Sequence, residues 1–264
     1  MKLRISFVWI ALSAIFAISG APRPAAAAFH IMQIEQVIGG VGGDATAQAV
    51  QLKMRIAGQN LLNGNAQLVV RDATGANPIV LSNFAGTNPA SSACKEILLA
   101  TPGFSAKTNP SAVPNYTMLS PIPQSYLAGG SLLFQTPTGT VYWRLSWGSY
   151  SGPQTVLAGT SPTANDSDGN AAPPFAAALP SSSAQAVRYT DTCTSDPNSS
   201  DSTTNAADYA LTAGAATFTN NGGASFVVTA GPPIPGLPDA AKLLLPVALG
   251  LAALALAVLR RRTS

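Results

Sequence analysis

Two stretches of the chain alternate strictly between apolar and polar residues, and this pattern constrains the fold more than any other feature. They are residues 48–56 (QAVQLKMRI) and residues 140–147 (TVYWRLSW). Successive side chains of a β-strand point to opposite faces of the sheet. Each stretch therefore predicts an antiparallel strand with its apolar face in the core and its polar face in water. On this pattern, Trp143 and Trp147 are core residues rather than a platform for stacking sugars.

Shorter stretches of strand composition occur along the same part of the chain. They are residues 31–37, 68–71, 79–81, 132–135, 186–189 and 224–228. Turn dipeptides such as Asn-Gly and Thr-Gly separate several of them. Seven or eight short strands of this kind predict an all-β, antiparallel β-sandwich. Residues 83–124 and 149–183 are rich in Pro, Ser, Thr and Gly, and we expect long surface loops there with fragments of strand.

The first 28 residues have the layout of a secretory signal peptide. A basic start is followed by an apolar run and then by a cluster of small residues. We expect cleavage near Ala28, with an uncleaved membrane anchor as the alternative. The mature body, residues 29–230, would then be an exported domain.

Residues 242–259 form an apolar run that predicts a single transmembrane helix. As a helix the run has about the length of a hydrocarbon core. A Pro/Gly-rich linker at residues 231–241 precedes it, and a basic tail at residues 260–264 follows it. The tail contains Arg260, Arg261 and Arg262, and positive flanks stay in the cytoplasm. These arginines place the C-terminus inside and the body outside, and they disfavour a glycolipid-anchor signal.

The charge distribution gives no reason to expect a nucleic-acid partner. Charged residues make up only 9% of the chain, and the formal net charge is +3. The positive excess comes from the two ends, because residues 29–238 hold seven Lys and Arg against ten Asp and Glu. The body is therefore mildly acidic and lacks the basic surface that nucleic acid requires.

Cys94 and Cys193 are the only cysteines. In an exported protein such a pair predicts a disulfide, with two free thiols as the alternative. In the chain-entropy description, closing a loop of about 100 residues stabilises the fold by up to about 4.7 kcal/mol.

Four segments resemble bacterial lamin-tail domains. The first is residues 191–215, where an Asp/Thr-rich stretch leads into a motif containing Asn205, Asp208 and Tyr209. The others are residues 31–54, 59–70 and 126–135, which resemble the first strands and the Leu-x-x-Gly-Gly strand of that family in the same order. The resemblance implies an immunoglobulin-like β-sandwich with a structural or binding role, and it implies no catalytic residues.

The C-terminal region resembles bacterial sorting signals of the PEP-CTERM type. The shared architecture is a short Pro-rich segment, an apolar span and an arginine cluster. In this chain the Pro-rich segment reads GPPIPGLPDAAK at residues 231–242, without Pro-Glu-Pro. The resemblance implies a membrane-embedded, sortase-like processing enzyme as a partner, and a plain single-pass anchor is the alternative.

The residues that support catalysis are sparse. His30 is the only histidine and lies next to the expected mature N-terminus, so a Ser-His-Asp or Cys-His site is not expected. The alternating oxygens of Asp166, Asp168 and Asn170 form the one candidate metal site, for Ca²⁺, and a solvated turn is the alternative. No other cofactor is expected.

Together these patterns predict an exported, membrane-anchored cell-surface protein with a non-catalytic structural or adhesive ectodomain. Its expected partners are the membrane, through the C-terminal helix, and glycans or other surface proteins. A calcium- or glycan-binding accessory module of a surface complex is the alternative, followed by a hydrolase with an unrecognised site. C-terminal processing would release the protein from the membrane.

Overall fold

The structure is a computed structural model that describes residues 31–153, 173–190, 193 and 204–230. The expected signal peptide, linker, transmembrane helix and basic tail lie outside the described residues. Within the described ranges, no helix has the length and apolar character needed to cross a membrane.

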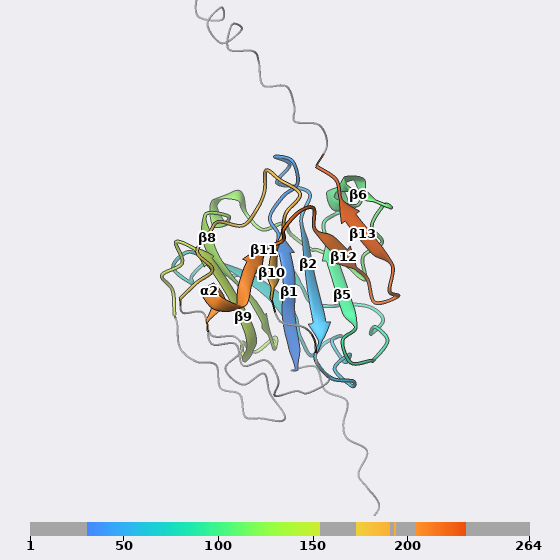
Figure 1. Ribbon diagram of the computed structural model, residues 1–264. Helices are drawn as coiled ribbons and strands as arrows, with labels where there is room; N and C mark the ends of the chain where they lie inside the picture. Colours follow the sequence, from blue (N-terminus) through green and yellow to red (C-terminus); the bar gives the residue numbers. More distant parts are fainter. Residues whose placement is uncertain (1–30, 154–172, 191–192, 194–203, 231–264) are drawn as a thin grey trace, which may run out of the picture.

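The described residues fold almost entirely into β-strands (Figure 1). In chain order the strands are β1 (Met32–Ile38), β2 (Ala49–Met54), β3 (Gln67–Asp72), β4 (Ile79–Ser82), β5 (Glu96–Ala100), β6 (Thr108–Asn109), β7 (Tyr116–Thr117), β8 (Gly129–Gln135), β9 (Val141–Gly148), β10 (Val187–Tyr189), β11 (Tyr209–Leu211), β12 (Thr217–Thr219) and β13 (Ser225–Val228). The helical elements are η1 (Pro102–Lys107), η2 (Gln124–Tyr126) and α2 (Asn205–Asp208). The shorter stretches with strand composition are all confirmed as strands, or as parts of strands.

Three sheets make up the fold. One sheet has six strands in the order β11-β10-β1-β2-β5-β7, and a second has four in the order β4-β3-β8-β9. A third sheet has three strands in the order β12-β13-β6. Neighbouring strands are antiparallel except β5 and β7, which are parallel. The prediction of an all-β sandwich is confirmed.

The main core lies between the six-stranded and the four-stranded sheet. Leu52 of β2 and Leu145 of β9 belong to it, and both are fully buried. Trp143 and Trp147 belong to the same cluster, as their strand pattern predicted. The apolar faces of the two alternating stretches therefore pack against each other, which is how each sheet removes its apolar side from water.

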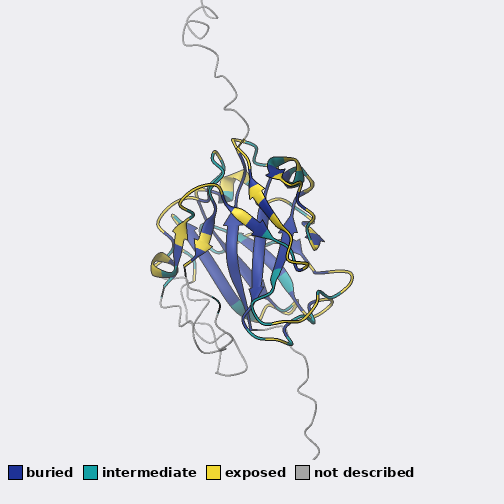
Figure 2. Ribbon diagram, turned by 45° about the vertical axis from the view of Figure 1, so that its right-hand side comes forward, coloured by how far each residue is buried: buried dark blue, intermediate teal, exposed yellow. Residues whose placement is uncertain are grey.

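The outer face of the six-stranded sheet is also buried along β1 and β2, and here the prediction of a polar face in water was wrong. Gln51, Lys53 and Arg55 are all buried, as are Arg144 and Ser146 in the second alternating stretch. Figure 2 shows the central strands in the colour of buried residues along most of their length.

The third sheet explains part of this burial. Its Phe218 and Phe226 form a second apolar cluster with Leu98 and Ala100 of β5 and with Phe104 of η1. The rings of Phe104 and Phe218 meet edge to face with centroids 5.1 Å apart. Sequence alternation cannot reveal this cover, because the covering strands come from distant parts of the chain.

Two buried glutamines join the third sheet to the six-stranded sheet. Gln36 Nε2 donates to the carbonyl oxygen of Thr217 at 2.7 Å, and the backbone N–H of Thr219 donates to Gln51 Oε1 at 2.6 Å. Gln36 Nε2 also donates to Gln51 Oε1 at 3.2 Å. The side chains of β1 and β2 thus supply hydrogen bonds to the edge strand β12. A buried polar face is stable only when it finds such partners.

The stretch 83–124 is more ordered than the sequence suggested. It contains β5, a strand inside the six-stranded sheet with residues 97–100 fully buried. The residues EILLA lack alternation because both faces of the strand are covered, and a short continuous apolar run is the pattern of such a strand. Of the second expected loop, residues 154–172 lie outside the described residues.

The substitution Gln51→Leu tests whether the glutamine pair attaches the third sheet. It leaves the backbone N–H of Thr219 without its acceptor, so we expect a loss of about 1–3 kcal/mol in the free energy of unfolding. Urea denaturation measures this loss. The matched control is Gln67→Leu on β3, a half-buried position, where we expect a change below about 0.5 kcal/mol. Equal effects of the two substitutions would contradict this role.

Candidate functional site

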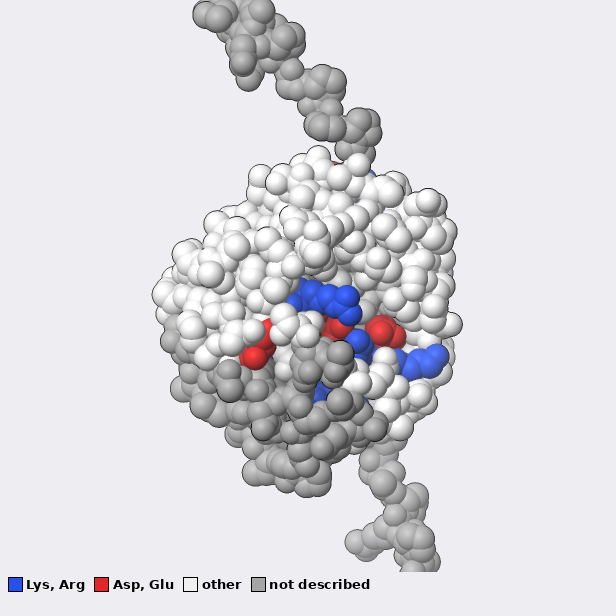
Figure 3. All heavy atoms as spheres, viewed as in Figure 1, with Lys and Arg blue, Asp and Glu red and all other residues white. Residues whose placement is uncertain are grey.

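Charged side chains gather on one part of the molecule. Figure 3 shows them near the centre of the face viewed, and most of the other described residues on this face are uncharged. The group that we call the Glu35 cluster comprises Glu35 of β1, Lys53 of β2, Glu96 of β5 and Arg188 of β10. These four strands are neighbours in the six-stranded sheet, so four separate parts of the chain bring the cluster together.

A β-bulge in β1 places Glu35 on the outer face. Ile34 pairs with Leu52 and Gln36 pairs with Gln51, so Glu35 has no residue opposite it on β2. The bulge makes Glu35 and Gln36 share one face, because Ile34 and Val37 on either side of them belong to the main core. Bulges redirect side chains in this way and are common beside functional sites.

The carboxylate of Glu35 is buried, with 1% of its side chain exposed. Lys53 Nζ lies 2.8 Å from Oε1, Arg188 Nη2 lies 3.4 Å from the same oxygen, and Gln33 Nε2 donates to Oε2 at 2.6 Å. Lys53 Nζ also lies 3.7 Å from Glu96 Oε1. The negative charges of two carboxylates are balanced by the positive charges of Lys53 and Arg188. A buried charge needs such partners to be stable.

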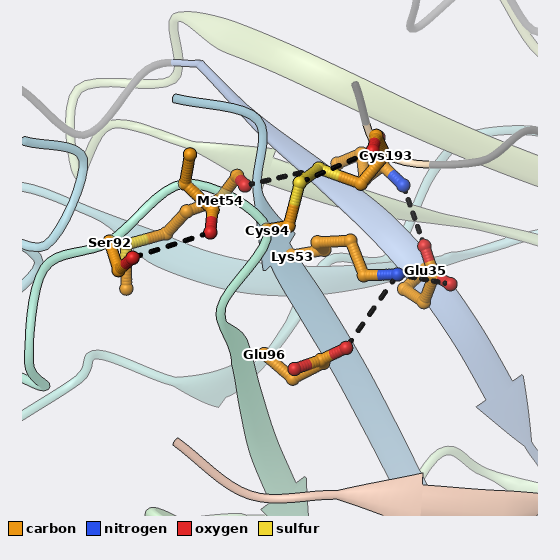
Figure 4. Close-up of a disulfide and its surroundings, with 9 residues drawn as sticks. Glu35, Lys53, Met54, Ser92, Cys94, Glu96 and Cys193 are labelled. Atoms are coloured by element: carbon orange, nitrogen blue, oxygen red, sulfur yellow. Dashed lines mark hydrogen bonds and ion pairs between the residues drawn. A yellow bond between two sulfur atoms is a disulfide. The ribbon is translucent and has the colours of Figure 1, made fainter. Parts of the chain in front are cut away.

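A disulfide between Cys94 and Cys193 borders the cluster (Figure 4). The two Cα atoms are 5.6 Å apart, a normal separation for a disulfide. The predicted pairing is therefore confirmed. Cys94 precedes β5 and Cys193 follows β10, so the bond links two strands that are separated by β1 and β2 in the sheet. It fixes the chain near Lys53 and Glu35.

A groove of about 450 Å³ opens beside the cluster along the edge strand β11. We call it the β11 groove, and its lining includes Lys53, Arg188, Thr190, Cys193, Leu211 and Thr212. The Arg188 side chain is 54% exposed and supplies an accessible cation. Leu211 supplies an exposed apolar contact. This mixture of an accessible cation, hydroxyls and a small apolar surface suits binding.

The three motif residues Asn205, Asp208 and Tyr209 have structural partners. Asn205 Oδ1 accepts from the backbone N–H and from the hydroxyl of Ser146, and its Nδ2 donates to the carbonyl oxygen of Arg144. Asn205 thereby completes the hydrogen bonding of the edge strand β9. Thr204 Oγ1 accepts from the N–H of Ala207, and Asp208 Oδ2 accepts from the N–H of Thr204. The two bonds are reciprocal as in a capping box, with Asp208 one position later than the usual acidic residue, and they close the single turn of α2.

Tyr209 lies inside the main core. Its hydroxyl donates to the carbonyl oxygen of Ile34 at 2.7 Å and accepts from Trp143 Nε1 at 2.7 Å. Burial raises the pKa of Tyr209 well above its usual range. The phenol therefore stays neutral and joins the two main sheets by hydrogen bonds.

The calcium candidates Asp166, Asp168 and Asn170 lie outside the described residues. So do the arginines Arg260, Arg261 and Arg262. Within the described part of the chain, no three His, Cys, Asp or Glu side chains group closely enough to hold a metal ion. The calcium site and the membrane topology stay predictions.

Sequence reasoning missed the Glu35 cluster. One signal was present: the adjacent polar pair Glu35-Gln36 interrupts the apolar alternation of residues 31–38. Two consecutive polar residues within a buried strand indicate a bulge. Lys53 was assigned to a solvent-facing side, so nothing pointed to a buried partner for it.

No family model, curated protein or solved structure matches this chain. The resemblances to lamin-tail domains and to PEP-CTERM signals therefore stay predictions from the sequence.

Removing the positive charge of Lys53 tests the cluster. In Lys53→Met the buried carboxylate of Glu35 loses its nearest base, and breaking a buried pair in this way costs about 3–5 kcal/mol. We expect a value near the lower end, about 3 kcal/mol, because Gln33 and Arg188 still contact Glu35. Urea denaturation at neutral pH measures the loss.

A double variant and an exposed pair are the controls. Glu35→Gln combined with Lys53→Met removes both charges, and we expect it to regain at least half of the lost stability. Lys107→Met breaks the ion pair of 3.5 Å with Asp44, in which about a third of each side chain is exposed. Its cost should stay below about 1 kcal/mol. A Lys53→Met effect no larger than that of Lys107→Met would contradict the assignment.

Tyr209→Phe tests the structural role of the motif. The substitution leaves the carbonyl oxygen of Ile34 and the indole N–H of Trp143 without their partner. We expect a loss of about 2–3 kcal/mol in the free energy of unfolding, from unsatisfied buried groups. The control is Tyr126→Phe, whose hydroxyl makes an exposed bond to the carbonyl oxygen of Asn77. A melting temperature equal to that of the control would exclude this role.

Proposed function

We propose that this chain is an exported, membrane-anchored cell-surface protein whose β-sandwich serves as a non-catalytic structural or adhesive module. The Cys94–Cys193 disulfide is the observation that carries the proposal. Disulfides persist in oxidising compartments and are rare in the cytosol. The signal-peptide pattern of residues 1–28 and the apolar run 242–259 support the same location.

The β-sandwich supports a finer proposal about the type of module. We propose an immunoglobulin-like domain of the lamin-tail kind, which rests on the resemblance of residues 31–54 and 191–215. The motif residues Asn205 and Tyr209 have buried structural partners, in agreement with a family that shares a fold rather than a catalytic site.

An adhesive role agrees with the character of the surface. Outside the Glu35 cluster, most of the described residues on the face in Figure 3 are uncharged. The β11 groove offers Arg188, threonine hydroxyls and Leu211 together. Neutral polar surface with a few oriented cations suits contacts with glycans or with other surface proteins, and we propose these as the partners.

The C-terminal segment determines how long the module stays attached. We propose that residues 242–259 hold the body outside the membrane with Arg260, Arg261 and Arg262 on the cytoplasmic side. A sortase-like enzyme that cuts within residues 231–242 would transfer the body to the outer envelope or release it.

Intact-mass measurement of the native protein in membrane and culture-supernatant fractions tests the location. We expect an N-terminus near residue 29 and two oxidised cysteines. In the membrane fraction the mass should end at Ser264, and in the supernatant it should end within residues 231–242. A matched variant that lacks residues 2–28 should stay in the cytoplasm with both thiols reduced.

A wild-type mass that retains Met1, with free thiols and a cytoplasmic location, would contradict the proposal. Oxidised protein found only in the supernatant and ending at Ser264 would contradict the anchor but not the export.

A further inference from the structure

The outer face of the four-stranded sheet carries two arginines on either side of one strand. Arg71 lies on β3 and Arg144 lies on β9, and β8 runs between them. In the register of the sheet, Arg71 pairs with Ser131 of β8, and Arg144 pairs with Leu133 of β8. The main core is on the opposite side, where β8 contributes Leu132 and Phe134.

A pocket of about 260 Å³ lies between these arginines. We call it the two-arginine pocket. Its lining includes Arg71, Leu133, Val141, Arg144, Tyr150 and Pro153. The pocket therefore combines two guanidinium groups with an apolar wall. Lys53 and Arg188 line a different pocket, the β11 groove on the six-stranded sheet.

One buried polar atom of the pocket lining lacks a partner. Arg144 is 6% exposed, and its Nη1 donates to the carbonyl oxygen of Pro153 at 2.9 Å. Among the described residues its Nε has no hydrogen-bond partner. The hydroxyl of Ser131, which lies in register with Arg71 but is not part of the pocket lining, also has no partner there. A buried polar group of this kind needs a partner, and a ligand or solvent can supply it.

The two guanidinium groups also lack a counter-charge. Within the described ranges, neither Arg71 nor Arg144 forms an ion pair with a carboxylate. The adjacent carboxylate of Asp72 already accepts from Thr74, Ala76 and Asn77. Burial lowers the pKa of Arg144; Tyr150 opposes this lowering, and the charge of Arg71 adds to it. Lys53, by contrast, has two carboxylates beside it.

The backbone bonds that the arginines make hold them in place. Arg71 Nη1 donates to the carbonyl oxygen of Gly75 at 3.1 Å. Pro153 O accepts from Arg144 and also from the hydroxyl of Tyr150 at 3.1 Å. Fixed guanidinium groups lose little entropy when they bind, and their planar shape matches the two oxygens of a carboxylate.

We propose that the two-arginine pocket binds the carboxylate of an acidic sugar, such as a uronic acid unit of a polysaccharide. The arginines would bind the carboxylate, and Leu133, Val141 and Pro153 would contact the C–H face of the ring. The volume suits one ring, and it exceeds what the short side chain of an aspartate fills. This inference goes beyond an adhesive role and holds whether or not the chain is anchored.

Calorimetric titration of the full chain with methyl glucuronide tests the proposal. We expect saturable binding, and at least tenfold weaker binding of the uncharged methyl glucoside. Arg71→Gln and Arg144→Gln should each weaken methyl glucuronide at least tenfold. The control Lys107→Gln removes a positive charge that belongs to neither pocket and should leave the affinity unchanged. Arg71 is only half-buried, so its variant stays informative if Arg144→Gln fails to fold.

Four outcomes would overturn the proposal. They are no binding of methyl glucuronide, equal binding of methyl glucoside, unchanged affinity in Arg71→Gln, and equal or tighter binding of inorganic phosphate or of N-acetyl-aspartate amide. None of these outcomes bears on the cellular location, so this test and the mass measurement can fail separately.

Discussion

The burial of both faces of the six-stranded sheet along its central strands β1 and β2 is the constraint on which the rest of the structure depends. Its inner face meets the four-stranded sheet through apolar side chains. Its outer face carries Gln36, Gln51 and Glu35, which cannot be left in a dry environment without partners. The third sheet and the Glu35 cluster supply most of those partners, and among the described residues Gln36 Oε1 is the only buried side-chain atom of this group that has none. Without these partners, the outer polar groups of β1 and β2 would be stable only in contact with water. The third sheet would then lose the hydrogen bonds that join it to β1 and β2.

The bulge in β1 divides this outer face into two parts. Gln36 lies on the side that meets β12, and Glu35 lies on the side of Lys53 and Arg188. One extra residue in a strand thus creates a neutral attachment for the third sheet and, next to it, a compensated group of charges. The disulfide then fixes the chain at the charged end. The Glu35 cluster and the attachment of the third sheet have the same cause, because the bulge in β1 places both Glu35 and Gln36 on the outer face.

The sequence predicted the parts of the fold that follow from local pattern. Alternation in residues 48–56 and 140–147 identified two central strands and the faces that enter the main core. Two cysteines in a chain with an export pattern were enough to predict the disulfide. The buried indoles of Trp143 and Trp147 followed from the same alternation.

The cover of the outer face was not predictable in this way. It depends on residues 108–109 and 217–228, which are distant from β1 and β2 in the chain. A polar residue in an alternating strand indicates water only when nothing else covers that face. The two candidate sites also depend on which strands are neighbours in the sheets. Glu35 contacts Arg188, 153 positions further along the chain, and Arg71 and Arg144 line one pocket from strands on either side of β8. Such arrangements come from sheet order, which the pattern of one strand does not contain.

Hydrogen exchange on the native chain tests the central claim most directly, because it measures the opening of each strand separately. If β12 and β13 close the outer face, their amides should open together with those of β1 and β2, with opening free energies within about 1 kcal/mol of each other. If β12 and β13 exchange several kcal/mol more easily while β1 and β2 stay protected, the third sheet would be a separate unit. The outer polar face would then be stable without it, which would contradict this account.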